Sequence, residues 1–405
     1  MQWFWSKVSQ KSERKGDRYT IRLLIQFLRG LDHSAHRLKS SDLYSGEYFH
    51  NNSNIMFMPS SVRKLRTAIL LLVAGLGACK KSSGPPAPLV VTVSTLAGNL
   101  TAGDVNGNGT AAQFSEPYGV AYKQGNIYVA DYHNFLLRQI TLAGTVTSVK
   151  NNMGTPVIFP GPSGVALDVQ GNIYVSEFAN HKIDELNAAG VQSVFAGNAV
   201  PGYNDGPGST AQFNQPYGIA CDANGHIYVA DTHNNRIRAI TSSGMVSTLA
   251  GNGTPGWVDG NGTAAEFDKP EGIACDAEGN ILVTEIGNNL IRKVTPAGIV
   301  STVAGSGVGG YVDGPGKSAQ FNSPEGIALD PQGNMYVADY DNALIRKVTP
   351  AGVVSTLAGN GTAGYVDGDG KVAEFFRPFG MALDGQGNIY VGDLGNNMIR
   401  KITVK

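Results

Sequence analysis

Cysteine, histidine and charged residues are all scarce in this chain. Its 405 residues include 3 cysteines and 7 histidines, and 16% of the residues are charged. Neither a G-x-S-x-G nor an H-E-x-x-H motif occurs, so the sequence offers no serine-hydrolase elbow and no linear zinc-protease site. No cysteine can be matched with a histidine as a catalytic pair. We therefore predict no catalytic residues from linear motifs.

A basic stripe of the kind that binds a phosphate backbone is also missing. Residues 80–405 contain 19 basic and 27 acidic residues, a net charge of −8. Contacts to phosphate supply most of the affinity for nucleic acid, so an acidic surface opposes such binding. A nucleic-acid partner is therefore not expected.

A repeated block accounts for much of the chain and for its 53 glycines. The marker of each unit is a proline-x-glycine triplet, whose prolines are Pro117, Pro162, Pro216, Pro270, Pro324 and Pro378. The first interval is 45 residues and the other four are 54. This period is too long for helical hairpin repeats and is typical of propeller blades.

Each unit alternates apolar with small or polar residues in four short runs, which predicts strands. In the fourth unit the runs are 272–276, 280–284, 290–294 and 299–303. The sixth unit ends after its third run, but residues 93–98 near the start copy residues 354–359. We therefore predict an all-β, six-bladed β-propeller of four-stranded antiparallel blades, with the last blade completed by an N-terminal strand.

Over about residues 90–405 these units resemble the NHL repeat family. The motifs that carry the resemblance are Pro-x-Gly-Ile/Val-Ala, Gly-Asn-Ile-Tyr-Val-Ala-Asp and Asn-x-x-Ile-Arg-Lys. The resemblance implies the fold but leaves the activity open, since the family includes RNA-binding modules, protein-interaction modules, a peptide-amidating lyase and bacterial envelope proteins. That lyase takes its zinc histidines from the P-x-G position, where this chain has none.

The front of the chain has the three-part layout of a secretory signal. Basic residues around Arg63 precede the apolar run 68–76, which is too short to span a bilayer. Residues 76–79, Leu-Gly-Ala-Cys, resemble the lipobox of bacterial lipoproteins, which implies lipidation of Cys79. We expect a signal peptide at 58–79, a flexible tether at 80–90 and the propeller at 91–405.

Residues 1–57 do not fit an export signal that begins at Met58, so we expect them to be an extension produced by a misassigned start codon. The protein is then expected in the cell envelope, held to the membrane by a lipid anchor only. Lys80 after the cysteine favours the outer over the inner membrane, by resemblance to enteric sorting.

The middle residue of the P-x-G triplet differs between units whose flanking residues are nearly constant. We expect these six residues to surround the mouth of the central channel and to be the candidate ligand-binding residues; the alternative is that they only plug the channel. They are Tyr118, Ser163, Tyr217, Glu271, Glu325 and Phe379.

Two further sets of acids are predicted to be scaffold. An acid closes each second strand, an asparagine follows three residues later, and five units carry an arginine in the third strand that can pair with the acid. The second unit has Asp184 instead of this arginine. The long loops contain Asp104, Asp205, Asp259, Asp313 or Asp367, for which an Asp-Gly turn is favoured over a calcium loop, because the register from Asp104 puts Ser115 where an EF-hand needs glutamate.

Cys221 and Cys275 occupy equivalent positions of adjacent units. Adjacent sheets lie roughly 10 Å apart, beyond the roughly 7 Å over which two Cα atoms can be bridged by a disulfide. We expect two free, buried thiols.

The leading expectation is a monomeric, lipid-anchored binding module for a protein, peptide or glycan, without catalysis and without a required cofactor. The alternative is a metal-dependent lyase or lactonase-like hydrolase at the channel mouth, in which Glu271, Glu325 and nearby asparagines would hold zinc or calcium.

Overall fold

The computed structural model describes residues 89–405. The predicted extension, the signal peptide with Cys79 and the tether up to residue 88 lie outside the described residues.

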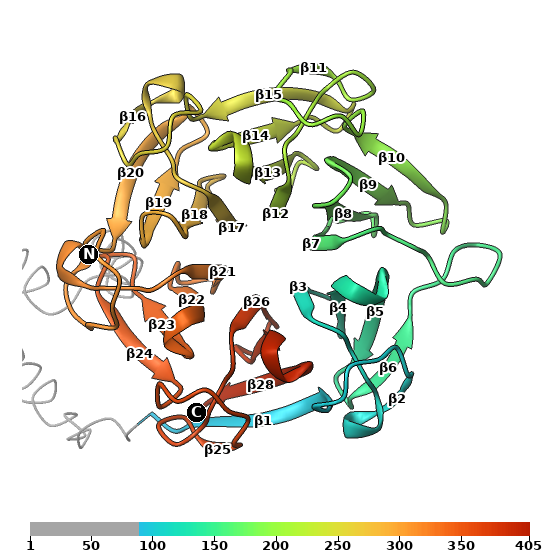
Figure 1. Cartoon of the computed structure of the whole chain (residues 1–405), viewed down its shortest axis with the longest axis vertical. Coiled ribbons are helices and arrows are strands. Elements are labelled where there is room, and N and C mark those ends of the chain that lie inside the picture. The colour runs from blue at the N-terminus through green and yellow to red at the C-terminus, as the bar shows by residue number, and fades with distance from the viewer. Residues whose placement is uncertain (1–88) are drawn as a thin grey trace, which may run out of the picture. The chain divides into compact units, whose positions relative to one another are not determined.

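Six antiparallel sheets stand around a central axis as the blades of a propeller, as Figure 1 shows. The innermost strand of each blade begins at the proline of the P-x-G triplet, and the acid closes the second strand. The inner strands are β3 (Pro117–Lys123), β7 (Pro162–Leu167), β12 (Pro216–Cys221), β17 (Pro270–Cys275), β21 (Pro324–Leu329) and β26 (Pro378–Leu383). The second strands are β4 (Asn126–Asp131), β8 (Ile173–Glu177), β13 (Ile227–Asp231), β18 (Ile281–Glu285), β22 (Met335–Asp339) and β27 (Ile389–Asp393).

The outer half of each blade follows the predicted order. The third strands are β5 (Leu136–Thr141), β9 (Lys182–Leu186), β14 (Arg236–Ile240), β19 (Leu290–Val294), β23 (Leu344–Val348) and β28 (Met398–Val404). The fourth strands are β6 (Thr145–Ser148), β10 (Gln192–Ala196), β15 (Met245–Ala250), β20 (Ile299–Ala304), β24 (Val354–Ala358) and, for the last blade, β1 (Val91–Gly98). The fold class is confirmed.

The ring is closed as predicted, by a strand from upstream of the first blade. β1 pairs antiparallel with β28, from Val91 opposite Val404 to Gly98 opposite Met398. Figure 1 shows β1 lying along the outside of the last blade. Because each end of the propeller contributes to this sheet, neither β1 nor β28 is left as an open edge.

Four blades carry a short fifth strand that the sequence did not predict. These are β2 (Gly107–Asn108), β11 (Gly206–Pro207), β16 (Gly260–Asn261) and β25 (Gly368–Asp369). In the fifth blade an isolated bridge between Gly314 and Val354 takes the same place. In the second blade no strand of the described chain pairs outside β10, because the short connection 149–161 lacks the residues that form this strand elsewhere.

The remaining regular elements are single 3-10 turns. They are η2 (Gly109–Ala111), η3 (Tyr132–Asn134), η4 (Thr232–Asn234), η5 (Gly262–Ala264), η6 (Gly316–Ser318), η7 (Tyr340–Asn342) and η8 (Leu394–Asn396). Four of them, η3, η4, η7 and η8, directly follow a second strand.

The apolar core lies between neighbouring blades. Ile237 of the third blade, for example, packs in one cluster with Phe267 and Val283 of the fourth. A phenylalanine from the loop before each inner strand is fully buried, and this ring consists of Phe114, Phe159, Phe213, Phe267, Phe321 and Phe375. A single four-stranded sheet cannot cover both of its faces, so burial of these side chains requires the closed ring.

The glycine of the P-x-G triplet lets the inner strands converge. A Cβ atom at Gly218 would collide with the carbonyl oxygen of Glu271, and one at Gly272 with that of Glu325. The same contact joins Gly326 to Phe379. Glycine is therefore required by the close approach of neighbouring backbones, and this approach brings the six intervening side chains to the axis.

Candidate functional site

The acids that close the second strands are held by a buried ion-pair frame in five blades, as predicted. In the fifth blade Arg346 is fully buried, and its guanidinium lies 2.6 Å from an Asp339 oxygen and 2.6 Å from an Asp313 oxygen. The other Asp339 oxygen accepts the backbone N–H of Asn322. The arginines at the other four positions are Arg138, Arg238, Arg292 and Arg400. Since every carboxyl oxygen has a donor, this set is scaffold.

The loop aspartates belong to the same frame, with one correction. Asp205, Asp259, Asp313 and Asp367 each bind the arginine of their blade at 2.6–2.8 Å. Asp104 does not: in the first blade Asn106 accepts from Arg138 at 3.0 Å. Grouping Asp104 with the other four aspartates was therefore wrong by two positions, and Asn106 is the equivalent residue.

The second blade replaces the arginine with a lysine from a different position. Lys182 Nζ lies 2.9 Å from Asp184 and 3.3 Å from Glu177. Burial raises the pKa of Glu177 to about 7, and the Asp184 carboxylate adds to the rise. Glu177 Oε1 has no hydrogen-bond partner among the described residues, so this blade's frame is incomplete.

Cys221 and Cys275 are free, as predicted. Both pack against the cores between blades but are only partly buried, so the predicted burial holds in part. Each Sγ lies near the carbonyl oxygen of its own following aspartate, at 3.3 Å for Cys221 and 3.4 Å for Cys275.

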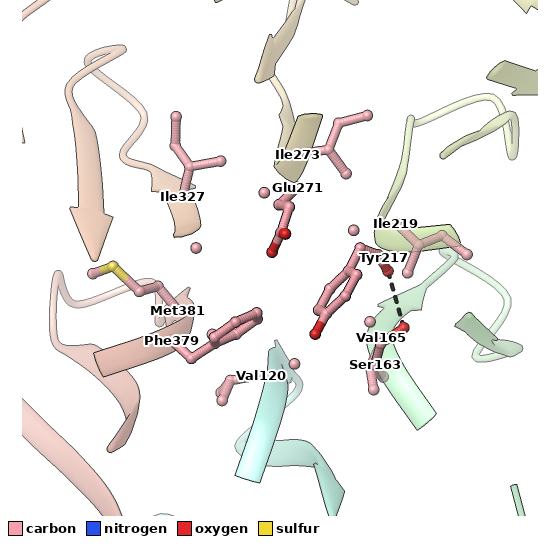
Figure 2. Close-up of a pocket in the computed structure, with 16 residues that line it drawn as sticks. Val120, Ser163, Val165, Tyr217, Ile219, Glu271, Ile273, Ile327, Phe379 and Met381 are labelled. Carbon is pink, nitrogen blue, oxygen red and sulfur yellow. Dashed lines mark hydrogen bonds between the residues drawn. The ribbon is translucent and has the colours of Figure 1, made fainter. Parts of the chain in front are cut away.

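The six residues of the P-x-G position meet at the channel axis. A cavity of about 60 Å³ lies there, and Ser163, Tyr217, Glu271 and Phe379 are among its lining residues. Figure 2 shows Glu271, Tyr217 and Phe379 projecting toward one another from three blades. Tyr118 and Glu325 stand beside this group, next to the lining residues Gly119 and Gly326.

Three aromatic rings fill one side of the channel. Ring centroids are 4.7 Å apart for Tyr118 and Phe379, 5.8 Å for Tyr118 and Tyr217, and 5.7 Å for Tyr217 and Phe379. Tyr118 reaches Tyr217 across the second blade because Ser163 there is small. These spacings are typical of packed aromatic pairs, so the rings narrow the channel at this level.

Ser163 differs from the other five residues because its hydroxyl is already occupied. It lies 3.1 Å from the carbonyl oxygens of Ser176 and Pro216 and 3.1 Å from the Ser176 hydroxyl. The side chain is 1% exposed. Ser163 therefore ties the second blade to the third.

Two carboxyl groups face each other on the other side of the axis. Glu271 and Glu325 lie within hydrogen-bonding reach of each other, and both are almost fully buried. Burial raises the pKa of Glu325 well above its ordinary value, and the adjacent Glu271 raises it further. Burial also raises the pKa of Glu271. Burial and mutual repulsion therefore favour retention of a proton by the pair.

Three further aromatic residues lie next to the mouth, and sequence reasoning missed them. Tyr132, Phe178 and Tyr340 each follow the acid of a second strand. Tyr132 lies 4.6 Å from Tyr118, Phe178 4.9 Å from Tyr217, and Tyr340 6.2 Å from Phe379, measured between ring centroids. The available signal was an aromatic residue at the same position of three units.

The residues just before the six prolines form the rim of the mouth. All have positive φ, and only one is glycine: they are Glu116, Gly161, Gln215, Lys269, Ser323 and Arg377. In four blades a side chain of the preceding blade accepts their backbone N–H, as Asn289 does from Ser323 at 2.8 Å. We call this hydrogen bond, from a rim N–H to a side chain of the preceding blade, the clasp. It holds a non-glycine residue in a backbone conformation that such residues rarely adopt.

The mouth places two carboxyl groups, those of Glu271 and Glu325, side by side near the axis. Within residues 89–405 no three histidine, cysteine, aspartate or glutamate side chains are grouped to hold a metal ion. A zinc site of the usual three protein ligands is therefore not assembled from these residue types. In the same part of the chain no helix is long and apolar enough to cross a membrane.

Comparison with known families supports the repeat assignment. The model of the Teneurin NHL domain matches residues 91–255, and the NHL repeat model matches residues 321–348. The chain is also similar to Protein SUPPRESSOR OF QUENCHING 1, chloroplastic, of Arabidopsis thaliana, with 32% identity over 265 residues, 58% of this chain and 25% of that protein. The chain spans between 8% and 34% of the length of the curated relatives it matches.

Solved structures share the fold at low identity. An auxiliary nutrient binding protein from Bacteroides thetaiotaomicron superposes with a TM-score of 0.61 and 19% identity, covering 78% of this chain and 77% of that one. A streptogramin B lyase superposes with a TM-score of 0.50 and 15% identity, covering 78% and 98%. These likenesses concern the fold alone.

Proposed function

Because this chain is a six-bladed β-propeller of NHL repeats, we propose that it is a non-catalytic binding module. It takes a protein, peptide or glycan at the channel mouth, on the face formed by the loops that follow the second and fourth strands. One hydrogen bond shows that these loops share a face, since Asn134 of the former donates to Gly103 of the latter at 2.7 Å.

The observation that carries this proposal is the contrast between a uniform scaffold and a non-uniform mouth. The arginine frame recurs in five blades, whereas the P-x-G side chains are aromatic in three blades, acidic in two and a serine in one. Scaffold needs alone would favour the same residue in each blade. Aromatic and acidic side chains gathered at one opening are typical of a binding site.

The same face also exposes aromatic side chains farther from the axis. Tyr203, Trp257, Tyr311 and Tyr365 occupy equivalent loop positions of blades three to six and are between 53% and 71% exposed. Exposed apolar side chains that recur in neighbouring blades favour contact with a partner. A ligand larger than the small central cavity has these rings to lie against.

We also propose that the propeller is exported and anchored by lipid at Cys79. The basic, apolar and small-residue regions before Cys79 support this part. Metabolic labelling with an alkyne fatty acid tests it: we expect label on the wild type and none on Cys79→Ala. Equal labelling of the two proteins contradicts the anchor, and membrane fractionation then assigns inner or outer membrane.

A second candidate is a lyase or lactonase-like hydrolase at the same mouth. The buried Glu325 carboxyl, whose pKa is raised, has the property of a general acid, and the likeness to streptogramin B lyase includes the whole propeller. In an enzyme, Glu325 would protonate a leaving group and Glu271 would accept a proton.

One set of measurements separates the two functions. The full-length protein is screened against glycan and peptide arrays, its metal content is determined, and turnover of cyclic esters is followed. The binding module predicts a captured ligand that is recovered unchanged and whose capture is lost in Tyr217→Ala. Turnover that disappears in Glu325→Gln would instead establish the enzyme.

A further inference from the structure

Glu325 carries an unsatisfied acceptor at the channel mouth. Its side chain is 6% exposed, and its Oε2 atom has no hydrogen-bond partner among the described residues. Glu271, its neighbour in the ring, projects into the cavity in Figure 2. A buried carboxylate oxygen without a donor is costly unless something else supplies the donor.

Aromatic side chains near this carboxyl pair favour a positive charge. Tyr217 and Phe379 line the cavity, and Tyr340 is close enough to Glu325 for its pKa to be raised in part by that carboxylate. The faces of aromatic rings attract cations, and the attraction is strongest where water is excluded. Two acids close to three aromatic rings therefore favour a donor that is cationic.

Lys269 lies near enough to oppose the rise in the pKa of Glu271, but no basic side chain of residues 89–405 forms an ion pair with either carboxyl. Lys269 and Arg377, the basic residues of the rim, are both exposed. Arg377 lies over the rings of Tyr340 and Phe376, at 5.6 Å and 5.5 Å from their centroids. Within residues 89–405 no salt bridge joins either side chain to Glu271 or Glu325.

We infer that the mouth binds one ammonium or guanidinium group, presented as the lysine or arginine side chain of a peptide or protein partner. This inference rests on the proposed binding function and names its ligand chemistry. The charged head donates to Glu325 and Glu271, and its aliphatic stem lies against Tyr217 and Phe379. The cavity of about 60 Å³ has room for such a head but not for a drug-sized ligand, whose pockets measure roughly 300 Å³ or more.

Proton release distinguishes this site from a merely structural acid pair. The titratable and charged groups that face the pair are Tyr217 from β12, Lys269 before β17, and Tyr340 and Asp341 after β22. Burial and the repulsion between the two carboxylates favour a proton on the empty pair. An arriving cation favours the doubly ionised pair, so binding releases a proton and tightens as the pH rises.

Calorimetric titration of the full-length protein with short peptides tests the inference. Four capped tripeptides of the form Gly-x-Gly carry lysine, arginine, norleucine or glutamate at the centre. We expect the lysine or arginine peptide to bind at pH 8, and Glu271→Gln and Glu325→Gln each to weaken that binding at least about tenfold. Glu278→Gln makes the same chemical change in the exposed turn between β17 and β18, on the opposite face, and should have no effect.

Each outcome has one meaning, provided that the glutamine variants keep a cooperative thermal transition. Equal binding of the norleucine and lysine peptides overturns the inference. Lysine-peptide binding that survives both glutamine substitutions also overturns it. So does a binding enthalpy that is the same in two buffers of different ionisation enthalpy, because binding then releases no proton. If no cationic peptide binds but a glycan or neutral peptide from the arrays does, the cation inference fails and the binding module stands. If the arrays and the tripeptides both fail, the proposed function fails as well.

Discussion

Two groups of buried carboxylates lie within one propeller, and their surroundings differ. The acid of the fifth blade's second strand, Asp339, receives Arg346 and the N–H of Asn322. Glu325, from the inner strand of the same blade, has an oxygen without a partner in the described chain. Burial raises the pKa in both cases, but only Asp339 has donors that oppose the rise. Donors to the carboxyl oxygens, more than burial, distinguish Asp339 from Glu325.

The second blade lies between these extremes. Lys182 replaces the missing arginine, yet one oxygen of Glu177 stays without a described partner. This blade also has no outer fifth strand and contributes the small Ser163 to the channel. The second blade therefore differs from the others in its frame, its outer edge and its contribution to the mouth.

The largest expected effect comes from opening the ring on which both groups depend. Deletion of Val91–Gly98 removes the partner of β28 and exposes the core around Val93, which is 1% exposed. We expect the cooperative thermal transition to be lost, because the last blade then has a free edge and an open face. Deletion of residues 80–87, in the segment expected to be a tether, is the control. An unchanged transition after removal of β1 would contradict closure.

The frame itself is tested by Arg346→Ala. The substitution leaves Asp339 buried without its cation, which typically costs about 3–5 kcal/mol. Chemical denaturation measures the loss, with Lys371→Ala on the exposed loop as a control near zero. A loss below about 1 kcal/mol would show that the frame contributes little.

Glu177→Gln and Glu285→Gln should have opposite effects. The folded-state pKa of Glu177 is raised from 4.5 to about 7, so the native state holds this proton more tightly and loses stability as the pH rises through that window. In Glu177→Gln this loss is absent. We expect the free energy of unfolding to rise by on the order of 1 kcal/mol at pH 8 and to be unchanged at pH 4. The expected gain is small because the variant also loses the ion pair with Lys182. Glu285→Gln should destabilise at pH 8, because Arg292 loses its partner. Unfolding curves at the two pH values that show the same sign for both variants would contradict the comparison.

The smallest effect concerns the clasp at the rim. Ala343 has a φ of 53° and stands where three other blades have an asparagine that accepts the next rim N–H. Ala343→Asn should stabilise by about 0.5–1.5 kcal/mol, since asparagine tolerates this conformation and offers an acceptor to Arg377. The reverse change, Asn289→Ala, should cost a similar amount. Destabilisation by Ala343→Asn in thermal denaturation would refute the role of the clasp.

Sequence periodicity predicted the fold because each repeat unit forms one blade. The P-x-G spacing located six blades, and the copy of residues 354–359 at 93–98 located the closing strand. The arginine frame followed from residue types at fixed spacing. Asn106 was missed because the long loops of the units were matched by their aspartates. In the first unit the residue that contacts the arginine is an asparagine, two positions after Asp104.

The mouth was predicted only in part. Its six positions could be identified because they vary within a constant repeat. Their interactions could not, because the rings of Tyr118 and Tyr217 meet across the second blade and the carboxyls of Glu271 and Glu325 meet between blades. Such contacts depend on side-chain directions around the axis, as does the occupied hydroxyl of Ser163.

The most direct test of the unsatisfied acid pair is a ¹³C NMR titration of protein labelled at the glutamate carboxyls. We expect one glutamate carboxyl to stay protonated at pH 7, to be absent from the spectrum of Glu325→Gln, to remain in that of Glu177→Gln, and to ionise when a lysine peptide is added. If every glutamate carboxyl other than Glu177 is ionised by pH 6, the mouth holds no shared proton, and the distinction between scaffold acids and site acids is wrong.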